Sequence, residues 1–253
     1  GGTPTTDEEY AGELTLSPSQ FERALACPLR WFLTTVGADG PSNAAASLGT
    51  LIHAVAEEHP HGTPEELTEA LEARIEELGY NLDTWAGRHS DRRARAIVEN
   101  LASYLVGVPG RVDVEQKVEA QVEGVTIRGR MDRLEYVDEG VRVTDLKTGS
   151  NPDPYRKVDE NAQLAAYQLA LLASGEDVAG ARIALLGTKK KPQTFDQKPL
   201  RGEALAQWRN KVREVAESAR GPYFEARPSD AACAYCSFDR LCPARERGHK
   251  VVE

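Results

Sequence analysis

Apolar residues recur at helical spacing through the first hundred residues of the chain. Four stretches with this period predict helices: residues 14–36, 47–58, 64–78 and 91–106. Ser17 and Thr63 are typical helix caps. Pro28 predicts that the first helix kinks or ends there, because proline removes a backbone donor and clashes with the preceding turn. A loop rich in Gly, Pro and Ser is expected at residues 37–42.

The period shortens to two after residue 110, which indicates strands. Val112, Val114 and Val118 alternate with polar residues, and residues 125–136 and 141–147 predict a hairpin around Asp138-Glu139-Gly140. Three further elements are expected: a helix at residues 158–173, a strand at 181–186 and a helix at 203–219. The predicted fold class is α/β (α+β), a small, mainly antiparallel mixed sheet flanked by helices, with a helical insertion before it.

A chain of 253 residues is long enough for one sizeable domain. We expect that domain at residues 14–246, with a helical portion at about 47–110, a core at about 111–220 and a cysteine region at 221–246. Residues 1–13 predict a disordered lead. The only methionine is Met131, and Gly1-Gly2 resembles a cleavage scar, so we expect a fragment of a larger protein or a trimmed chain.

The net charge of -9 argues against a simple DNA-coating protein, which would be basic. It is compatible with an enzyme that has a local basic groove and an acidic metal site. No apolar run approaches the ~20 residues that span a bilayer, and no secretory signal opens the sequence. We therefore expect a cytoplasmic bacterial protein with no membrane partner.

The strongest chemical signal lies in the predicted hairpin. If the turn is centred between Asp138 and Glu139, then Asp132 faces Asp145, and Lys147 shares the face of Asp145. Two carboxylates this close favour a cation between them, and hard oxygen ligands suit Mg²⁺ or Mn²⁺. A register slip of one residue would separate them. The alternative is a surface hairpin with an ordinary salt bridge.

These residues resemble the core motif of PD-(D/E)xK nucleases, and specifically the RecB-type branch. Gly129-Arg-Met-Asp132-Arg133 is followed by Asp145-Leu-Lys147-Thr148-Gly149, although Asp132 follows methionine rather than proline. The resemblance implies a restriction-endonuclease-like core in which Asp132 and Asp145 bind Mg²⁺ or Mn²⁺ and Lys147 is catalytic.

Two further motifs match this branch in chain order. Gly49-Thr-Leu-Ile-His53 resembles the motif whose histidine completes the metal site, and Gln163-Leu-Ala-Ala-Tyr167 resembles the Q-x-x-x-Y motif, which implies catalytic roles for Gln163 and Tyr167 in positioning water or DNA. Each motif alone is also typical of an ordinary helix. Glu115, on the strand before the hairpin, is a weaker metal-ligand candidate, because an exposed strand glutamate explains it equally well.

Four cysteines can serve one site: Cys27, Cys233, Cys236 and Cys242. A reducing compartment disfavours disulfides, and four thiolates suit zinc or an iron–sulfur cluster. The layout of one early cysteine and a late C-x-x-C-x-x-x-x-x-C resembles that of AddB-like helicase–nucleases, which implies a [4Fe-4S] cluster that staples the two ends of the domain. Zinc is the runner-up, and four buried free thiols are a third possibility.

We interpret the chain as a metal-dependent deoxyribonuclease, and we expect an exonuclease rather than a sequence-specific endonuclease. Analogy implies the nuclease domain of an AddAB- or AdnAB-like bacterial helicase–nuclease, which would process double-strand breaks for recombination repair. Its partners would be single-stranded or unwound DNA ends and a helicase domain or subunit. Two alternatives stay open: a non-catalytic DNA-binding scaffold with a degenerate site, and a stand-alone nuclease of the CRISPR-associated or oligonucleotide-degrading kind.

Overall fold

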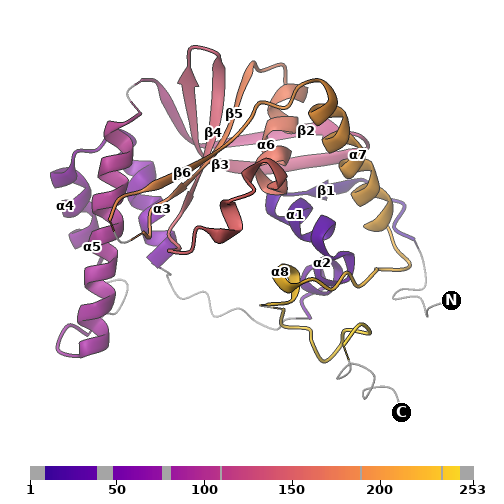
Figure 1. Ribbon diagram of the computed structural model, residues 1–253, viewed down its shortest axis with the longest axis horizontal. Helices are drawn as coiled ribbons and strands as arrows, with labels where there is room; N and C mark the ends of the chain where they lie inside the picture. Colours follow the sequence, from indigo (N-terminus) through magenta and orange to yellow (C-terminus); the bar gives the residue numbers. More distant parts are fainter. Residues whose placement is uncertain are drawn as a thin grey trace.

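The computed structural model describes residues 9–38, 48–75, 81–108, 110–188, 190–234 and 236–245. Its helices and strands follow the chain in one order (Figure 1): β1 (Leu14–Leu16), α1 (Pro18–Ala26), α2 (Pro28–Thr35), α3 (Leu48–Glu58), α4 (Pro64–Ile75), α5 (Trp85–Val106), β2 (Val112–Val122), β3 (Val125–Val137), β4 (Gly140–Lys147), the 3₁₀ turns η2 (Asp153–Tyr155) and η3 (Val158–Glu160), α6 (Ala162–Ala173), β5 (Val178–Leu185), β6 (Gln193–Gln197), α7 (Gly202–Ser218) and α8 (Asp230–Cys233).

Six strands of the described residues form one mixed sheet. Its order is β1-β3-β4-β5-β6, and β2 also pairs with β3. The pairs β2–β3, β3–β4 and β5–β6 are antiparallel, whereas β1–β3 and β4–β5 are parallel. The predicted fold class, a mainly antiparallel mixed sheet flanked by helices, is therefore confirmed.

The central strand β3 changes its neighbour half way along its length. Strand β2 covers one edge of β3 from residue 125 to residue 135, so β1 and β4 share the other edge. Strand β1 pairs with residues 125–127, and β4 pairs with residues 133–137. Asp132 lies between these two stretches, at a position of β3 that is paired with neither β1 nor β4.

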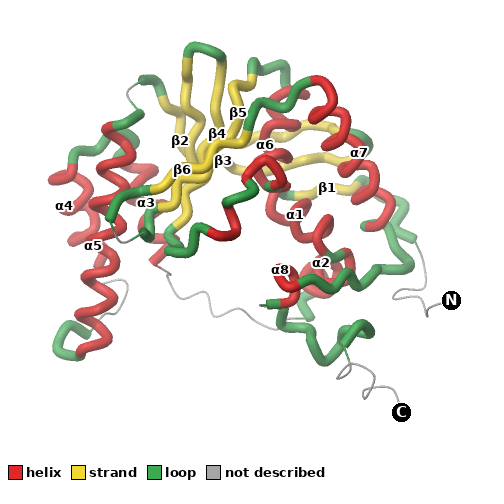
Figure 2. Tube along the Cα trace, in the orientation of Figure 1, coloured by secondary structure: helices red, strands yellow, loops and turns green. Residues whose placement is uncertain are grey.

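Two hydrophobic cores hold the sheet between its helices. One lies between the sheet and helices α1, α6 and α7 and includes Phe21 and Val143. The other joins α3, α4 and α5 to the ends of β4 and β5 through Leu146 and Ala184. Figure 2 shows these two helical groups on opposite sides of the sheet. Because neighbouring strand residues face opposite ways, Leu146 faces the α3–α5 group and Asp145 faces the other core.

The prediction of a helix at residues 14–36 is wrong for its first residues, but the predicted interruption at Pro28 is confirmed. Leu14–Leu16 is a strand with alternating burial that pairs in parallel with β3. Helix α1 begins after the predicted cap, since Ser17 Oγ accepts a hydrogen bond from Gln20 N at 3.1 Å. Cys27 is extended and separates α1 from α2 at Pro28, as the proline predicts.

Other elements differ from the prediction mainly at their ends. Helix α5 begins at Trp85 rather than residue 91, because the Thr84 side chain accepts a hydrogen bond from Gly87 N and caps an earlier turn. Strand β6 was not predicted. The predicted end of the helix at 64–78 and most of the predicted loop at 37–42 lie outside the described residues.

The segment before β1 contacts the end of α7. Tyr10 N donates to Arg220 O at 2.7 Å, and Arg220 Nη1 donates to Gly12 O at 2.8 Å. Residues 1–8 of the predicted disordered lead lie outside the described part. None of the described helices combines the length and the apolar character needed to cross a bilayer.

Candidate active site

Three acidic residues occupy one row across β2, β3 and β4. Residue 114 pairs with 133 and residue 116 with 131, which places Glu115 opposite Asp132. Residue 137 pairs with 140 and residue 133 with 144, so the next position places Asp132 opposite Asp145. The hairpin register counted from the sequence is therefore confirmed. The backbone pairing stops at this row, where Leu146 N donates instead to Asp132 Oδ2 at 2.7 Å.

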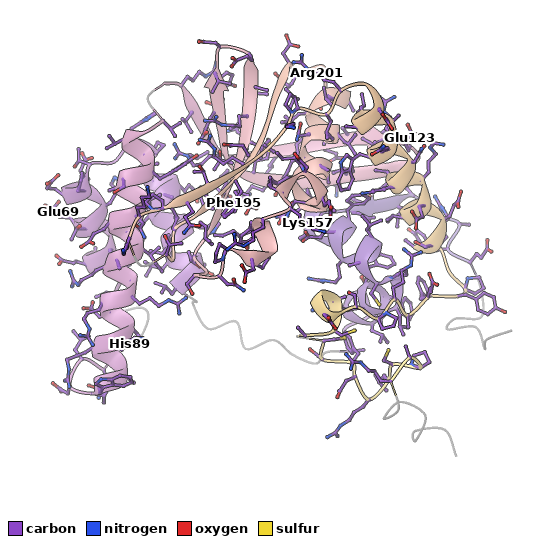
Figure 3. All side chains as sticks on the ribbon, viewed as in Figure 1. Glu69, His89, Glu123, Lys157, Phe195 and Arg201 are labelled. Carbon is purple, nitrogen blue, oxygen red and sulfur yellow. The ribbon has the colours of Figure 1, made fainter. Side chains whose placement is uncertain are left out.

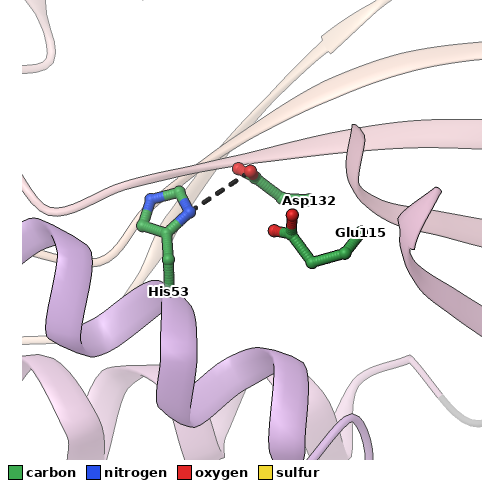
Figure 4. Close-up of side chains that lie close together, drawn as sticks. All are labelled: His53, Glu115 and Asp132. Atoms are coloured by element: carbon green, nitrogen blue, oxygen red, sulfur yellow. Dashed lines mark ion pairs between the residues drawn. The ribbon is translucent and has the colours of Figure 1, made fainter. Parts of the chain in front are cut away.

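The group of helices α3, α4 and α5 contributes one side chain, that of His53, next to this row. His53 of α3 places Nδ1 3.2 Å from Asp132 Oδ1. One ligand atom each from His53, Glu115 and Asp132 lies within 4.8 Å of the others (Figure 4). Glu115 Oε2 also accepts a hydrogen bond from Arg130 Nη1 at 3.0 Å. An imidazole and two carboxylates at this separation could hold one divalent cation.

Asp145 and Lys147 form a second group with Gln163 of α6. The Lys147 Nζ atom lies 2.8 Å from Asp145 Oδ2 and 3.3 Å from Gln163 Oε1. Gln163 Nε2 donates to Asp145 Oδ1 at 2.9 Å. A single amide therefore contacts both the carboxylate and the ammonium, and it fixes their relative positions.

The Asp145 carboxylate lies at the buried end of the acid row. Asp145 is 5% exposed, and both of its oxygens have polar partners: Oδ1 accepts a hydrogen bond from Gln163, and Oδ2 lies 2.8 Å from the Lys147 ammonium. A carboxylate that is buried to this extent requires such partners to remain charged.

The charges of the site are strongly coupled. Burial raises the pKa of Asp145, and the Lys147 ammonium opposes this change. Burial acts to lower the pKa of Lys147, but the Asp145 carboxylate outweighs burial, so the pKa is raised. The hydrogen bond to Asp132 raises the pKa of His53. Each of these three shifts favours the protonated form of its group in the protein without metal.

Tyr167 is buried beside β3. It is 6% exposed, and its hydroxyl donates to the carbonyl of Arg130 at 2.7 Å. Its ring also lies against Gly129, where an added Cβ would come within 3.2 Å of Cε1. The tyrosine thus anchors β3 two residues before Asp132, and its expected role in positioning water or DNA stays a prediction.

Two further residues near the site, Glu22 and Tyr155, could not be predicted from the sequence. Burial raises the pKa of Glu22 on α1; the nearby Lys147 ammonium acts to lower this pKa, and the Asp145 carboxylate acts to raise it. Burial also raises the pKa of Tyr155, which Lys147 opposes. Both residues lie outside the recognisable motifs, and only the packing of α1 and η2 brings them near the site.

The four cysteines are free thiols at partly buried positions. Cys27 lies near the C-terminal region, with Sγ 3.9 Å from Glu225 O, and Arg30 Nη1 donates to Ala232 O at 2.7 Å. Among the described residues, no three cysteine sulfur atoms gather as ligands of one metal ion. The two cysteine-bearing regions are neighbours, and the expected iron–sulfur cluster stays a prediction.

The sequence matches the PD-(D/E)XK nuclease superfamily over residues 15–243. This chain is a member of that superfamily. Nucleases of the PD-(D/E)XK superfamily use divalent metal ions, in agreement with the histidine and carboxylates gathered at Asp132.

A curated relative is the gene 69 protein of Mycobacterium phage D29. It is 27% identical over 267 residues, which cover 90% of this chain and 96% of the phage protein. Two solved structures are also similar to this PD-(D/E)XK chain. The protein SSO0001 has a TM-score of 0.47 at 15% identity, covering 92% of this chain and 88% of that one. An exonuclease candidate from Eubacterium rectale has a TM-score of 0.48 at 15% identity, covering 85% and 86%.

Proposed function

We propose that this chain is a divalent-metal-dependent deoxyribonuclease whose active site is centred on Asp132, Asp145 and Lys147. One observation supports this proposal above all. Asp132 and Asp145 lie opposite each other on neighbouring strands, and Lys147 contacts Asp145 from the same face of the sheet. Membership of the PD-(D/E)XK nuclease superfamily agrees with this assignment.

In this proposal His53, Asp132 and Asp145 hold Mg²⁺ or Mn²⁺, and Glu115 is a further candidate ligand. A bound ion of this kind activates water and stabilises charge on a phosphate. The ligands come from α3, β2, β3 and β4, so the site forms only when the helical group packs against the sheet.

Lys147 would act on the scissile phosphate or on the attacking water. Its ammonium is held between Asp145 and Gln163, so it can donate a hydrogen bond along a fixed direction to a phosphate oxygen. Gln163 would position both charged groups. Tyr167 would hold β3, and with it Asp132, in position through its hydrogen bond to the Arg130 carbonyl.

The decisive experiment is cleavage of labelled single-stranded DNA with Mn²⁺, with Mg²⁺ and with a chelator. We expect metal-dependent cleavage that falls by about 100-fold or more in Lys147→Ala, the effect typical of losing a preorganised electrostatic group. Lys198→Ala is the control: it removes an exposed lysine just after β6 and should leave the rate of cleavage unchanged. If the wild-type chain binds DNA but cleaves none with either metal, the chain is a non-catalytic module instead.

Exonuclease action is the finer part of the proposal, and it comes from the sequence resemblance. Linear and circular single-stranded DNA of equal length distinguish the two modes. An exonuclease degrades the linear form only, whereas cleavage of the circle requires endonuclease action.

We also propose that Cys27, Cys233, Cys236 and Cys242 bind a [4Fe-4S] cluster, with zinc as the runner-up. The nearness of the α1–α2 junction to residues 225–232 supports a shared site. A backbone hydrogen bond at Ser229 and the Arg245 guanidinium lower the pKa of the Cys233 thiol, which favours a ligating thiolate. Iron and zinc analysis with a visible spectrum of anaerobically purified protein separates the two. Absence of both metals contradicts the site.

The role in double-strand break repair beside a helicase is the least supported part. The phage D29 protein aligns over 96% of its own length, so that relative has little room for an attached helicase. The stand-alone alternative therefore stays open. Co-purification of the chain with a helicase from the bacterial cytoplasm would favour the helicase–nuclease, and purification of an active nuclease alone would favour the stand-alone enzyme.

A further inference from the structure

The N-terminal half of α5 presents an aromatic and basic stripe that the acid row does not use. Five exposed residues form it: Trp85, Arg88, His89, Arg92 and Arg93. They are spaced three and four positions apart, so they lie along one side of the helix. This part of α5, which includes His89, projects past the sheet (Figure 3).

The stripe leads to the active-site loop. Arg93 Nη2 lies 3.5 Å from the carbonyl oxygen of Thr148, the residue that follows Lys147. From Arg93 to Trp85 the helix advances eight residues, or about 12 Å. A chain of phosphates held at the catalytic lysine would therefore meet the arginines next and the tryptophan last.

The arginines of the stripe are not neutralised by carboxylates. On the flank of the same helix, Arg95 pairs with both Asp91 and Glu72. Within the described residues, Arg88 and Arg92 form no such pair, and their guanidinium groups donate only to backbone carbonyls. In a protein with a net charge of -9, a local run of unpaired positive charge is a surface for an anionic partner.

Trp85, at the end of the stripe farthest from Thr148, indicates which anionic partner the stripe binds. Trp85 is 70% exposed, and its ring stacks on His89 with centroids 5.4 Å apart and an angle of 14°. An exposed, oriented indole beside arginines matches the way unpaired bases are held, by stacking on a ring next to contacts with the backbone. In a duplex the base faces are already stacked and cannot meet this ring.

We infer that the α5 stripe binds single-stranded DNA and guides it to the active site, with Trp85 as a base-stacking platform. This inference rests on the proposed nuclease function for its direction, but the binding itself can be measured without cleavage. It predicts that the enzyme prefers an unpaired strand over a duplex.

The test is fluorescence anisotropy with labelled oligothymidylate of about 20 nucleotides, longer than the ~4–16 nucleotides that one OB fold covers. A chelator is present, so no cleavage occurs. We expect Trp85→Ala to weaken binding about five-fold or more, and Trp85→Phe to restore most of it. Arg88→Ala/Arg92→Ala should reduce the salt slope of log K by about 1.4, or 0.7 per phosphate contact.

The matched control removes two arginines elsewhere. Arg209→Ala/Arg213→Ala deletes the same charge from α7, where both residues face Glu123, and should leave the slope unchanged. Circular dichroism verifies that each variant folds. Stripe variants that bind within two-fold of the wild type with the same slope would overturn the inference, as would equal affinity for a blunt duplex. A stripe that binds DNA in a chain that never cleaves it would overturn the nuclease proposal alone.

Discussion

The Nδ1 atom of His53 lies 3.2 Å from Oδ1 of Asp132, and this contact joins the helical group to the central strand of the sheet. The hydrogen bond raises the pKa of the imidazole, because the protonated ring is the better donor to a carboxylate. Both residues are ligands in the proposed metal site, and this contact describes the protein without metal.

A pH dependence of stability follows from this pair. The folded pKa of His53 lies above its unfolded value of about 6.5, so its stabilisation is fully present below about pH 6.5 and is lost as pH rises through the folded pKa. We expect the free energy of unfolding of the metal-free wild type to fall relative to His53→Asn across that range. Urea titrations in chelator at several pH values measure this difference. A difference that does not vary with pH would contradict the assignment.

Gln163 offers a test of positioning in the active site. Gln163→Leu keeps much of the side-chain volume but removes the contacts with Asp145 and Lys147. We expect kcat to fall about 10- to 100-fold, the usual effect of losing a group that orients a ligand, with little change in KM. Gln207→Leu on the exposed face of α7 is the control. Unchanged kcat in Gln163→Leu would show that Lys147 does not depend on the amide.

A buried ionic network on the other face of the sheet predicts a large stability effect. Glu135 is 0% exposed; Tyr104 OH donates to its Oε1 at 2.5 Å, Arg142 Nη2 donates to its Oε2 at 2.8 Å, and Arg133 Nε lies 3.5 Å away. Glu135→Ala leaves the fully buried Arg133 without its carboxylate, and we expect a loss of about 3–5 kcal/mol in urea unfolding. Glu119→Ala, which breaks an exposed pair with Arg128, should cause no measurable loss.

Gly129 permits close packing of α1 on β3. A Cβ at this position would lie 2.7 Å from Pro18 Cδ and 3.2 Å from Tyr167 Cε1. We expect Gly129→Ala to lower the stability by about 1–3 kcal/mol through overpacking, and to reduce activity because Tyr167 is displaced. Gly107→Ala, whose added carbon would meet only Tyr104 O at 3.4 Å, is the control for thermal unfolding. Equal melting temperatures would contradict the packing argument.

Local features of the structure could be predicted well from the sequence. The hairpin turn at Asp138-Glu139 fixes the β3–β4 register by counting, and that count alone placed Asp132 opposite Asp145. The caps at Ser17 and Thr63 were also predicted, and Thr63 exchanges hydrogen bonds with Glu66 in the structure. These features depend on a few consecutive residues, so the sequence contains them directly.

Features that depend on distant contacts could not be predicted. Leu14–Leu16 is too short for its period to reveal a strand, and its partner residues lie more than 100 positions later. The burial of Tyr167, the bridge made by Gln163 and the nearness of Glu22 all depend on how α1 and α6 pack on the sheet. The cysteine spacing predicted one shared cluster, and the structure brings Cys27 near residue 225 without gathering three sulfur atoms of the described residues around one ion, so that cluster stays a prediction.

The parallel pairing of β1 with β3 has a consequence for the order of assembly. During synthesis β1 emerges early, but its partner segment at residues 125–127 is made only after α3, α4 and α5. Those three helices pack on one another through Ile52, Leu71 and Leu101, and their contacts are closer in sequence than the pairing of β1 with β3. The first strand cannot pair until β3 has been made, and this pairing closes a loop of more than 100 residues, which is expected to slow it.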